Sequence, residues 1–224
     1  MSSPIPIQCI RVATISLILL LGSAVTQAQQ TIHVPADQPT IQAAISAANN
    51  GDTVLVAPGT YVENINFGGK AITVTSSGGP SGTMIDGGAQ GSVVTFSTGE
   101  GLTSVLNGFT VRNGLRNGLF GGGIYIASAS PTITGNIITG NHAAAGCGIY
   151  VYGGSPLIQN NTITANDQTG AGDGGDGGGG IVVSGTSSAP SNPQIIGNAI
   201  KNNSVAAGGF GGGISVDYFS SLLI

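Results

Sequence analysis

The sequence predicts an all-β solenoid, a parallel β-helix with a short N-terminal capping α-helix. An eleven-residue pattern, Pro-x-Ile-x-x-Asn-x-Ile-x-x-Asn, starts at residues 131, 156 and 193. A Gly-rich element that ends in an alternating apolar run starts at residues 121, 146, 178 and 211, and its isoleucines are 25, 32 and 33 residues apart. This period suits one coil of a solenoid with variable loops and is too long for a hairpin. We therefore expect a fold built by stacking coils.

The repeats contain short runs in which apolar and small polar residues alternate, such as Ile124-Tyr125-Ile126. This alternation predicts half-buried strands, because successive side chains of a strand point to opposite faces. Aligned repeats place isoleucines in columns at residues 133, 158 and 195 and at residues 138, 163 and 200. Stacking about 4.8 Å apart would bury both columns, and each buried aliphatic side chain contributes about 1.5–3 kcal/mol.

Asparagines form two further columns, at residues 136, 161 and 198 and at residues 141, 166 and 203. We expect a structural role for them, because stacked amides hydrogen-bond along the axis and asparagine tolerates the left-handed conformation of sharp corners. The segment from Gly101 follows the same plan, with Phe109 in place of the first asparagine. Runs at 53–58, 71–76 and 92–97 predict earlier strands, which gives five to six coils in all.

A helix is predicted before the coils. Pro39 would start it, apolar residues follow at helical spacing from Ile41 to Ala48, and Asn50-Gly51 would stop it. An uncovered end of a stack exposes unpaired backbone groups. We expect this helix to cap that end.

The segment HVPADQPTIQAAISAANNGDTVLVAPGTYVENI, followed by GFTVRNG and the Gly-rich and Asn-rich coils, resembles right-handed parallel β-helix repeat proteins of the pectate-lyase-like superfamily. The resemblance covers nearly all of residues 31–219. It implies a right-handed parallel β-helix. It does not select an activity, since that superfamily includes lyases, glycoside hydrolases, esterases, tailspikes and repeat proteins without assigned chemistry.

The ends of the chain predict export and truncation. Residues 1–28 resemble a signal peptide, with Arg11, an apolar stretch from 12 to 21 and a small-residue cleavage site, and that stretch is too short to span a bilayer. The expected mature domain is 29–224, without a retained membrane span and located at the cell surface, in the periplasm or in the medium. The last coil opens at Gly211 and stops on apolar residues, so we expect the chain to be C-terminally truncated.

Composition limits the partners. The formal net charge is −4, and only 6% of residues are charged while Gly numbers 40. An acidic chain does not suit nucleic acid. A surface rich in hydroxyl and amide groups suits a polysaccharide or a cell-surface glycan. Cys147 is the one cysteine of the predicted mature chain, so no intrachain disulfide is expected there, and its position predicts packing in the core.

No complete active site is visible in the sequence. Residues 59–63, Gly-Thr-Tyr-Val-Glu, resemble a segment of pectin methylesterases, but the accompanying motifs of those enzymes do not occur, so Tyr61 and Glu63 are predicted to pack the first coil. A lyase would need carboxylates near a base. Arg112 is expected to face outward without a carboxylate in reach, and is therefore interpreted as a solvated surface residue.

One acidic loop remains, with Asp167, Asp173 and Asp176 among glycines. It is interpreted as a solvated loop, with a Ca²⁺ site as the alternative, and otherwise no metal or cofactor is expected. His142 is expected in a turn, and together with Cys147 alone it makes no zinc site.

Tyr125 and Tyr150 occupy the same strand position in successive coils, near an outward column that contains Tyr152 and Asp217. If exposed, Tyr125 and Tyr150 could pack against sugar faces, and they are the predicted substrate-binding residues; the alternative is an aromatic pair that stabilises the sheet. The sequence therefore favours an exported module that contacts a polysaccharide or forms surface architecture. Two alternatives remain, a polysaccharide lyase or glycoside hydrolase with catalytic coils beyond residue 224, and a structural adhesin.

Overall fold

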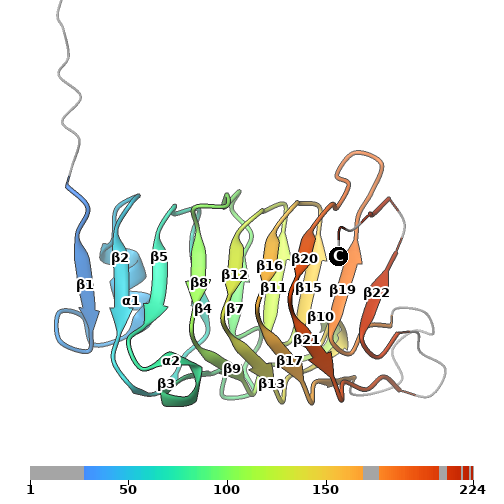
Figure 1. Cartoon of the computed structure of the whole chain (residues 1–224), viewed down its shortest axis with the longest axis horizontal. Helices are drawn as coiled ribbons and strands as arrows, with labels where there is room; N and C mark the ends of the chain where they lie inside the picture. Colours follow the sequence, from blue (N-terminus) through green and yellow to red (C-terminus); the bar gives the residue numbers. More distant parts are fainter. Residues whose placement is uncertain (1–27, 169–176, 207–210, 218, 222, 224) are drawn as a thin grey trace, which may run out of the picture.

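The computed structural model describes residues 28–168, 177–206, 211–217, 219–221 and 223. Their strands form four parallel sheets that run along one axis, as Figure 1 shows. The chain passes from one sheet to the next and returns to the first after each coil. This is the predicted all-β parallel β-helix. Nearly all of the predicted signal peptide, together with Asp173 and Asp176, lies outside the described residues.

Sheet A is the longest and begins at the N-terminal end of the stack. Its strands, in spatial order, are β1 (Thr31–Val34), β2 (Thr53–Val56), β5 (Thr73–Ser76), β8 (Val105–Asn107), β12 (Thr132–Thr134), β16 (Leu157–Gln159) and β20 (Gln194–Ile196). The predicted runs at 53–58 and 71–76 therefore form strands.

Sheets B and C contain six strands each. Sheet B consists of β3 (Gly59–Val62), β6 (Thr83–Asp86), β9 (Thr110–Arg112), β13 (Ile137–Thr139), β17 (Thr162–Thr164) and β21 (Ala199–Lys201). Sheet C consists of β4 (Ile65–Asn66), β7 (Val94–Phe96), β11 (Ile124–Ala127), β15 (Ile149–Tyr152), β19 (Ile181–Ser184) and β22 (Ile214–Val216). A short helix, α2 (Gly79–Gly82), connects β5 to β6.

Sheet D was not predicted. It consists of β10 (Leu115–Phe120), β14 (His142–Ala145) and β18 (Asp167–Gln168), each inserted between a strand of sheet B and a strand of sheet C. His142, expected in a turn, therefore starts a strand. These segments carry no strand signal in the sequence, since Arg-Asn-Gly and Ala-Ala-Ala do not alternate in polarity.

The isoleucine columns lie in the core as predicted. Ile133 pairs with Ile158, and Ile158 with Ile195, while the second column joins Ile138 to Ile163. Ile133, Ile138, Ile158 and Ile163 are completely buried. Phe109 is buried too, and its backbone N–H donates to Asn136 Oδ1 at 2.9 Å, so the phenyl ring starts the column that asparagines continue.

The asparagine columns are hydrogen-bonded ladders. Asn136 Nδ2 donates to Asn161 Oδ1 at 3.1 Å, and Asn141 Nδ2 donates to Asn166 Oδ1 at 3.0 Å. The expected reason for their position was wrong, because the ladder asparagines are not the left-handed residues. Positive φ occurs one residue earlier in every case, at residues 135, 140, 160, 165, 197 and 202. The preceding residue makes the corner, and the asparagine closes it by binding backbone.

Helix α1 (Ile41–Ala47) packs against β1, β2 and β4, and buries Ile41, Ala44 and Ile45. It begins two residues later than predicted, because Thr40 is the N-cap and its hydroxyl accepts from Ala43 N–H at 3.0 Å. It also ends at Ala47, before the predicted Asn50-Gly51 stop. The helix covers apolar residues at the N-terminal end of the stack, as expected of a cap.

Two charged side chains fix the ends of α1. Glu63 accepts from the N–H groups of Ile41 and Gln42, both at 2.9 Å, and Lys70 Nζ donates to three carbonyl groups at the C-terminal end. These charges match the helix dipole. The predicted packing role of Glu63 is confirmed, as is that of Tyr61, whose hydroxyl donates to the Ala57 carbonyl at 3.0 Å.

Candidate ligand groove

An open groove lies on the outer face of sheet C, beside the first strand of sheet D. Its volume is about 360 Å³, and it is lined by Gln90, Gly91, Ser92, Thr95, Leu115, Arg116, Asn117 and Leu119. The connection from β6 to β7 contains no inserted strand, whereas the next coil inserts β10. The groove therefore lies over β7, where sheet D has not yet begun.

Arg116 is the cation of this groove. Its Nη1 donates to Ser92 Oγ at 3.3 Å, and its guanidinium carbon lies 5.0 Å from the centroid of the Tyr125 ring. A cation at this distance over an aromatic face is attracted by the ring quadrupole. Among the described residues Arg116 forms no ion pair with a carboxylate. Its charge thus remains available to a ligand.

The groove also offers neutral groups of two kinds. Gln90, Thr95 and Asn117 contribute amide and hydroxyl groups, which can both donate and accept. Leu119 is 52% exposed and contributes apolar surface. A few polar groups beside apolar surface are typical of small-molecule sites. This combination matches a sugar, which has hydroxyl edges and apolar C–H faces.

Tyr125 and Tyr150 are brought together as the spacing predicted. They pair in register between β11 and β15, with ring centroids 6.0 Å apart and planes 2° from parallel. The exposure that sugar packing would require is absent at Tyr150, which is only 7% exposed. Phe120 stacks on it at 4.7 Å, and Ala145 and Val182 pack around it. Tyr150 holds sheet D onto sheet C, whereas Tyr125 lies beneath Arg116, which lines the groove.

Tyr152 and Asp217 lie on the same side of sheet C, as expected. Ala127, Tyr152 and Ser184 pair in register, and Asp217 follows Val216, which pairs with Val183. Tyr152 packs against the cluster around Tyr150. This column therefore lies beside the covered part of sheet C and away from the groove.

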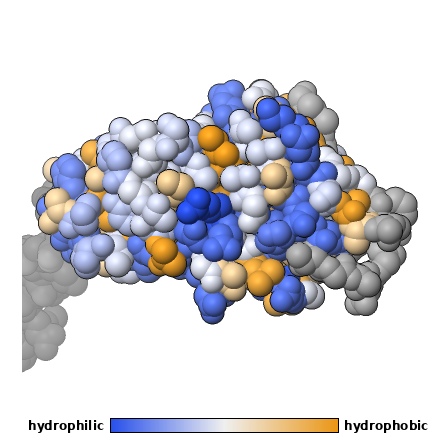
Figure 2. Space-filling model, turned by 90° about the horizontal axis from the view of Figure 1, so that it is seen from below, coloured by the Kyte–Doolittle hydropathy of each residue, from blue (hydrophilic) through white to orange (hydrophobic). Residues whose placement is uncertain are grey.

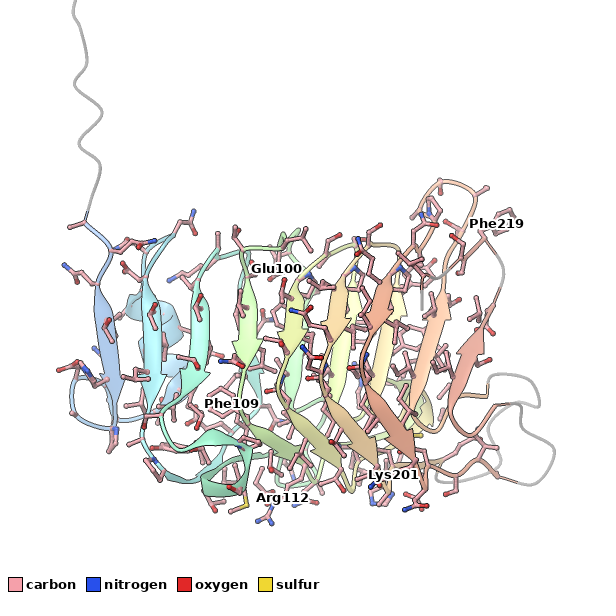
Figure 3. The ribbon with its side chains drawn as sticks, in the orientation of Figure 1. Glu100, Phe109, Arg112, Lys201 and Phe219 are labelled. Atoms are coloured by element: carbon pink, nitrogen blue, oxygen red, sulfur yellow. The ribbon has the colours of Figure 1, made fainter. Side chains whose placement is uncertain are left out.

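The prediction that Arg112 has no carboxylate in reach is wrong. Arg112 Nε donates to Asp86 Oδ2 at 2.9 Å, because Asp86 lies in register on the preceding coil. Burial alone would raise the pKa of Asp86, but hydrogen bonds from Gly88, Asn113 and Arg112 outweigh it and lower this pKa. Arg112 and Asp86 therefore pair with each other, and Asp86 also accepts hydrogen bonds from the turn residue Gly88 and from Asn113. Arg112 does extend outward from sheet B, as does Lys201 (Figure 3).

Seen from below, the molecule shows hydrophilic and apolar side chains interspersed rather than segregated (Figure 2). Many side chains on this face have intermediate hydropathy and are drawn in pale colours.

The other carboxylates have structural partners. Asp52 accepts from the N–H groups of Gln30 and Asn49, both at 2.8 Å, and these bonds lower its pKa, with that from Asn49 the larger cause. Buried Glu100 accepts from Gly69 and Thr98 N–H groups at 2.8 and 2.9 Å. A carboxylate held in this way is poorly placed to transfer protons. No carboxylate is among the groove-lining residues.

The acidic loop is described only at its start. Asp167 lies on β18 and its Oδ1 contacts His142 Nδ1, so this carboxylate joins two coils of sheet D. Within the described ranges no three His, Cys, Asp or Glu residues gather as a metal site would require. Cys147 is completely buried, as predicted, and burial raises the pKa of its thiol to about 11.

The fold and the groove define a class of protein: a parallel β-helix with a polar, cation-containing groove on its side. The family described as "Right handed beta helix region" matches residues 40–224, and the chain belongs to it. No curated protein and no solved structure matches the chain significantly. In the part of the chain that the structure describes, no helix is long and apolar enough to cross a membrane.

Sequence reasoning found Tyr125 and missed the groove itself. Ser92, Thr95 and Arg116 are far apart in the repeat pattern, and no motif links them. Thr95 had one available signal, because it occupies the same column as Tyr125 one coil earlier. The position of Arg116 depends on how β10 folds back over sheet C, which sequence spacing does not define.

Proposed function

We propose that this protein is an exported module that contacts a polysaccharide through the groove over β7. The observation that carries the proposal is the groove itself, where amide and hydroxyl groups, exposed Leu119 and the Arg116 guanidinium converge, and Arg116 forms no ion pair within the described residues. Thr95 and Gln90 would bind sugar hydroxyls, Leu119 would pack on a C–H face, and Arg116 would bind a hydroxyl or carboxylate. Tyr125 supports Arg116 from behind rather than serving as an open platform.

The location outside the cytoplasm is part of this proposal. It is supported by the signal-like residues 1–28 and by the hydroxyl-rich surface with few charges. The net charge of −4 opposes contact with nucleic acid. A lyase or glycoside hydrolase is less well supported, because the described groove lining lacks the carboxylates that such chemistry needs.

The test is affinity electrophoresis of the protein in native gels that contain xylan, hydroxyethyl cellulose, galactomannan, alginate or polygalacturonate. The proposal expects retardation by at least one polymer. Arg116→Ala should weaken it by about tenfold or more, since a charged hydrogen bond contributes about 1.5–3 kcal/mol. Lys201→Ala is the matched control, because it removes an exposed cation from sheet B and should leave retardation unchanged.

Two results would contradict the proposal. Migration in all five gels at the same rate as in a gel without polymer would exclude these polysaccharides as partners and favour a structural adhesin. Calcium-dependent release of unsaturated sugar ends from one of the polymers would instead identify a lyase.

A further inference from the structure

The floor of the groove belongs to a column that runs along the axis of the stack. Asn66, Thr95, Tyr125, Tyr150 and Val182 pair in register on successive strands of sheet C. These strands lie side by side along the axis in Figure 1. Neighbouring positions are separated by about 4.8 Å, close to the length of one sugar residue. A fully open column would thus accommodate a long glycan chain.

Sheet D closes this column step by step toward the C-terminal end. Thr95 lines the groove, but the guanidinium of Arg116 lies over the Tyr125 ring at 5.0 Å. Phe120 then stacks on Tyr150 at 4.7 Å with planes 11° apart. At the next strand Val182 is completely buried. The column is therefore open at exposed Asn66 and half-buried Thr95, overlain by Arg116 at half-buried Tyr125, and buried at Tyr150 and Val182.

A second wall meets the first. The connection at residues 90–92 lines the groove where β7 begins, so it limits passage across the strands. Its Ser92 is 8% exposed, and its hydroxyl donates to the Gly121 carbonyl while it accepts from Arg116. This network ties the two walls together. The groove is thus a corner with walls on two adjacent sides.

We propose that the groove recognises the end of a glycan chain, or a terminal branch residue, rather than a segment within a chain. This inference rests on the proposed function. A segment within a chain needs an exit at both ends of its site, and here one direction ends against Arg116 and Phe120. The volume of about 360 Å³ agrees, because it lies near the lower limit of the roughly 300–1,000 Å³ typical of ligand pockets. The remainder of the glycan would leave past Asn66.

The test uses oligosaccharides of one to six residues derived from the five polymers, with binding measured by isothermal titration calorimetry. The expected affinity rises from one residue to two and then changes by less than about twofold up to six, since added residues make no further contact. A rise of more than about tenfold between the dimer and the hexamer would overturn the inference. Polymer retardation combined with that rise would leave the proposed function intact. Absence of both retardation and oligosaccharide binding would overturn the proposed function and this inference together.

A variant and a ligand-free measurement test the wall directly. Arg116→Ala combined with Phe120→Ala should open the column over Tyr125 and Tyr150 and make the hexamer bind more tightly than the dimer. Arg116→Ala combined with Leu102→Ala, which truncates a side chain that is 54% exposed outside the groove lining, should not. Nitration by tetranitromethane with peptide mapping reports accessibility even if the variant folds poorly. In the parent protein Tyr150 should stay unmodified. Nitration of Tyr150 in the folded parent as fast as in the urea-unfolded chain would overturn the inference.

Discussion

Replacement of Asn166 by alanine should destabilise the stack strongly. Asn166 is completely buried, and its Oδ1 accepts from Asn141 N–H at 3.1 Å while its Nδ2 donates to the Ile138 carbonyl at 3.0 Å. Alanine would leave both backbone groups without these partners in a buried site. Each unsatisfied group costs about 1–3 kcal/mol, so Asn166→Ala should cost about 2–6 kcal/mol.

That cost is large against the roughly 5–15 kcal/mol that stabilises a typical domain. For a chain of this length it corresponds to a decrease in Tm of about 4–24 °C, at about 2–4 °C per kcal/mol. Thermal unfolding followed by circular dichroism would measure it, and native-state hydrogen exchange would locate it at the Asn141 amide. Thr164→Ala is the control, because Thr164 lies on the same coil, is half-buried and points outward.

The reasoning would be refuted if Asn166→Ala unfolded within about 0.5 kcal/mol of the parent, the range of ordinary surface substitutions. Unchanged protection of the Asn141 amide would refute it independently. In either case the ladder would be a consequence of stacking and not a cause of its stability.

Three further predictions concern close packing, burial and charge. Gly148→Ala should prevent correct stacking, because the alanine Cβ would lie 2.5 Å from the Gly180 carbonyl oxygen. Gly101→Ala is the control and should fold normally, because a Cβ there would have nothing within 4 Å. Equal yields of soluble folded protein from the two variants would contradict the prediction for Gly148. Cys147 should resist alkylation in the folded protein at pH 8 and react on unfolding, since burial raises its thiol pKa to about 11. The stability of the folded protein should also fall above pH about 9, because there only the unfolded chain loses the thiol proton. Asp37, Asp52 and Asp86 all have lowered pKa values, so their contribution to the stability of the folded chain is present above their ordinary pKa near 3.8 and is lost as the pH falls below it. Asp52→Asn should therefore reduce the fall of Tm in acid. An unchanged fall of Tm in acid would argue against this role of Asp52.

Much of the fold could be predicted because its signals are local and repeated. A strand of alternating residues must turn one face inward, and equal spacing places equal residues in one column, which is why Ile133, Ile158 and Ile195 align. The same logic aligned Tyr125 with Tyr150. The repeat does not align Asp86 with Arg112, because Asp86 lies on the preceding coil in a segment without the eleven-residue pattern.

The sequence by itself determined the stacked coils, the buried isoleucine columns, the asparagine ladders and the packing roles of Tyr61, Glu63 and Cys147. Only the tertiary structure decided which outward residues are accessible. Sheet D has no periodic signal, and it covers Tyr150 with Phe120 while it leaves Thr95 open beside Arg116. The physical reason is that the repeat defines which residues share a column, whereas accessibility depends on how an irregular insertion packs against that column. The groove arises from that packing.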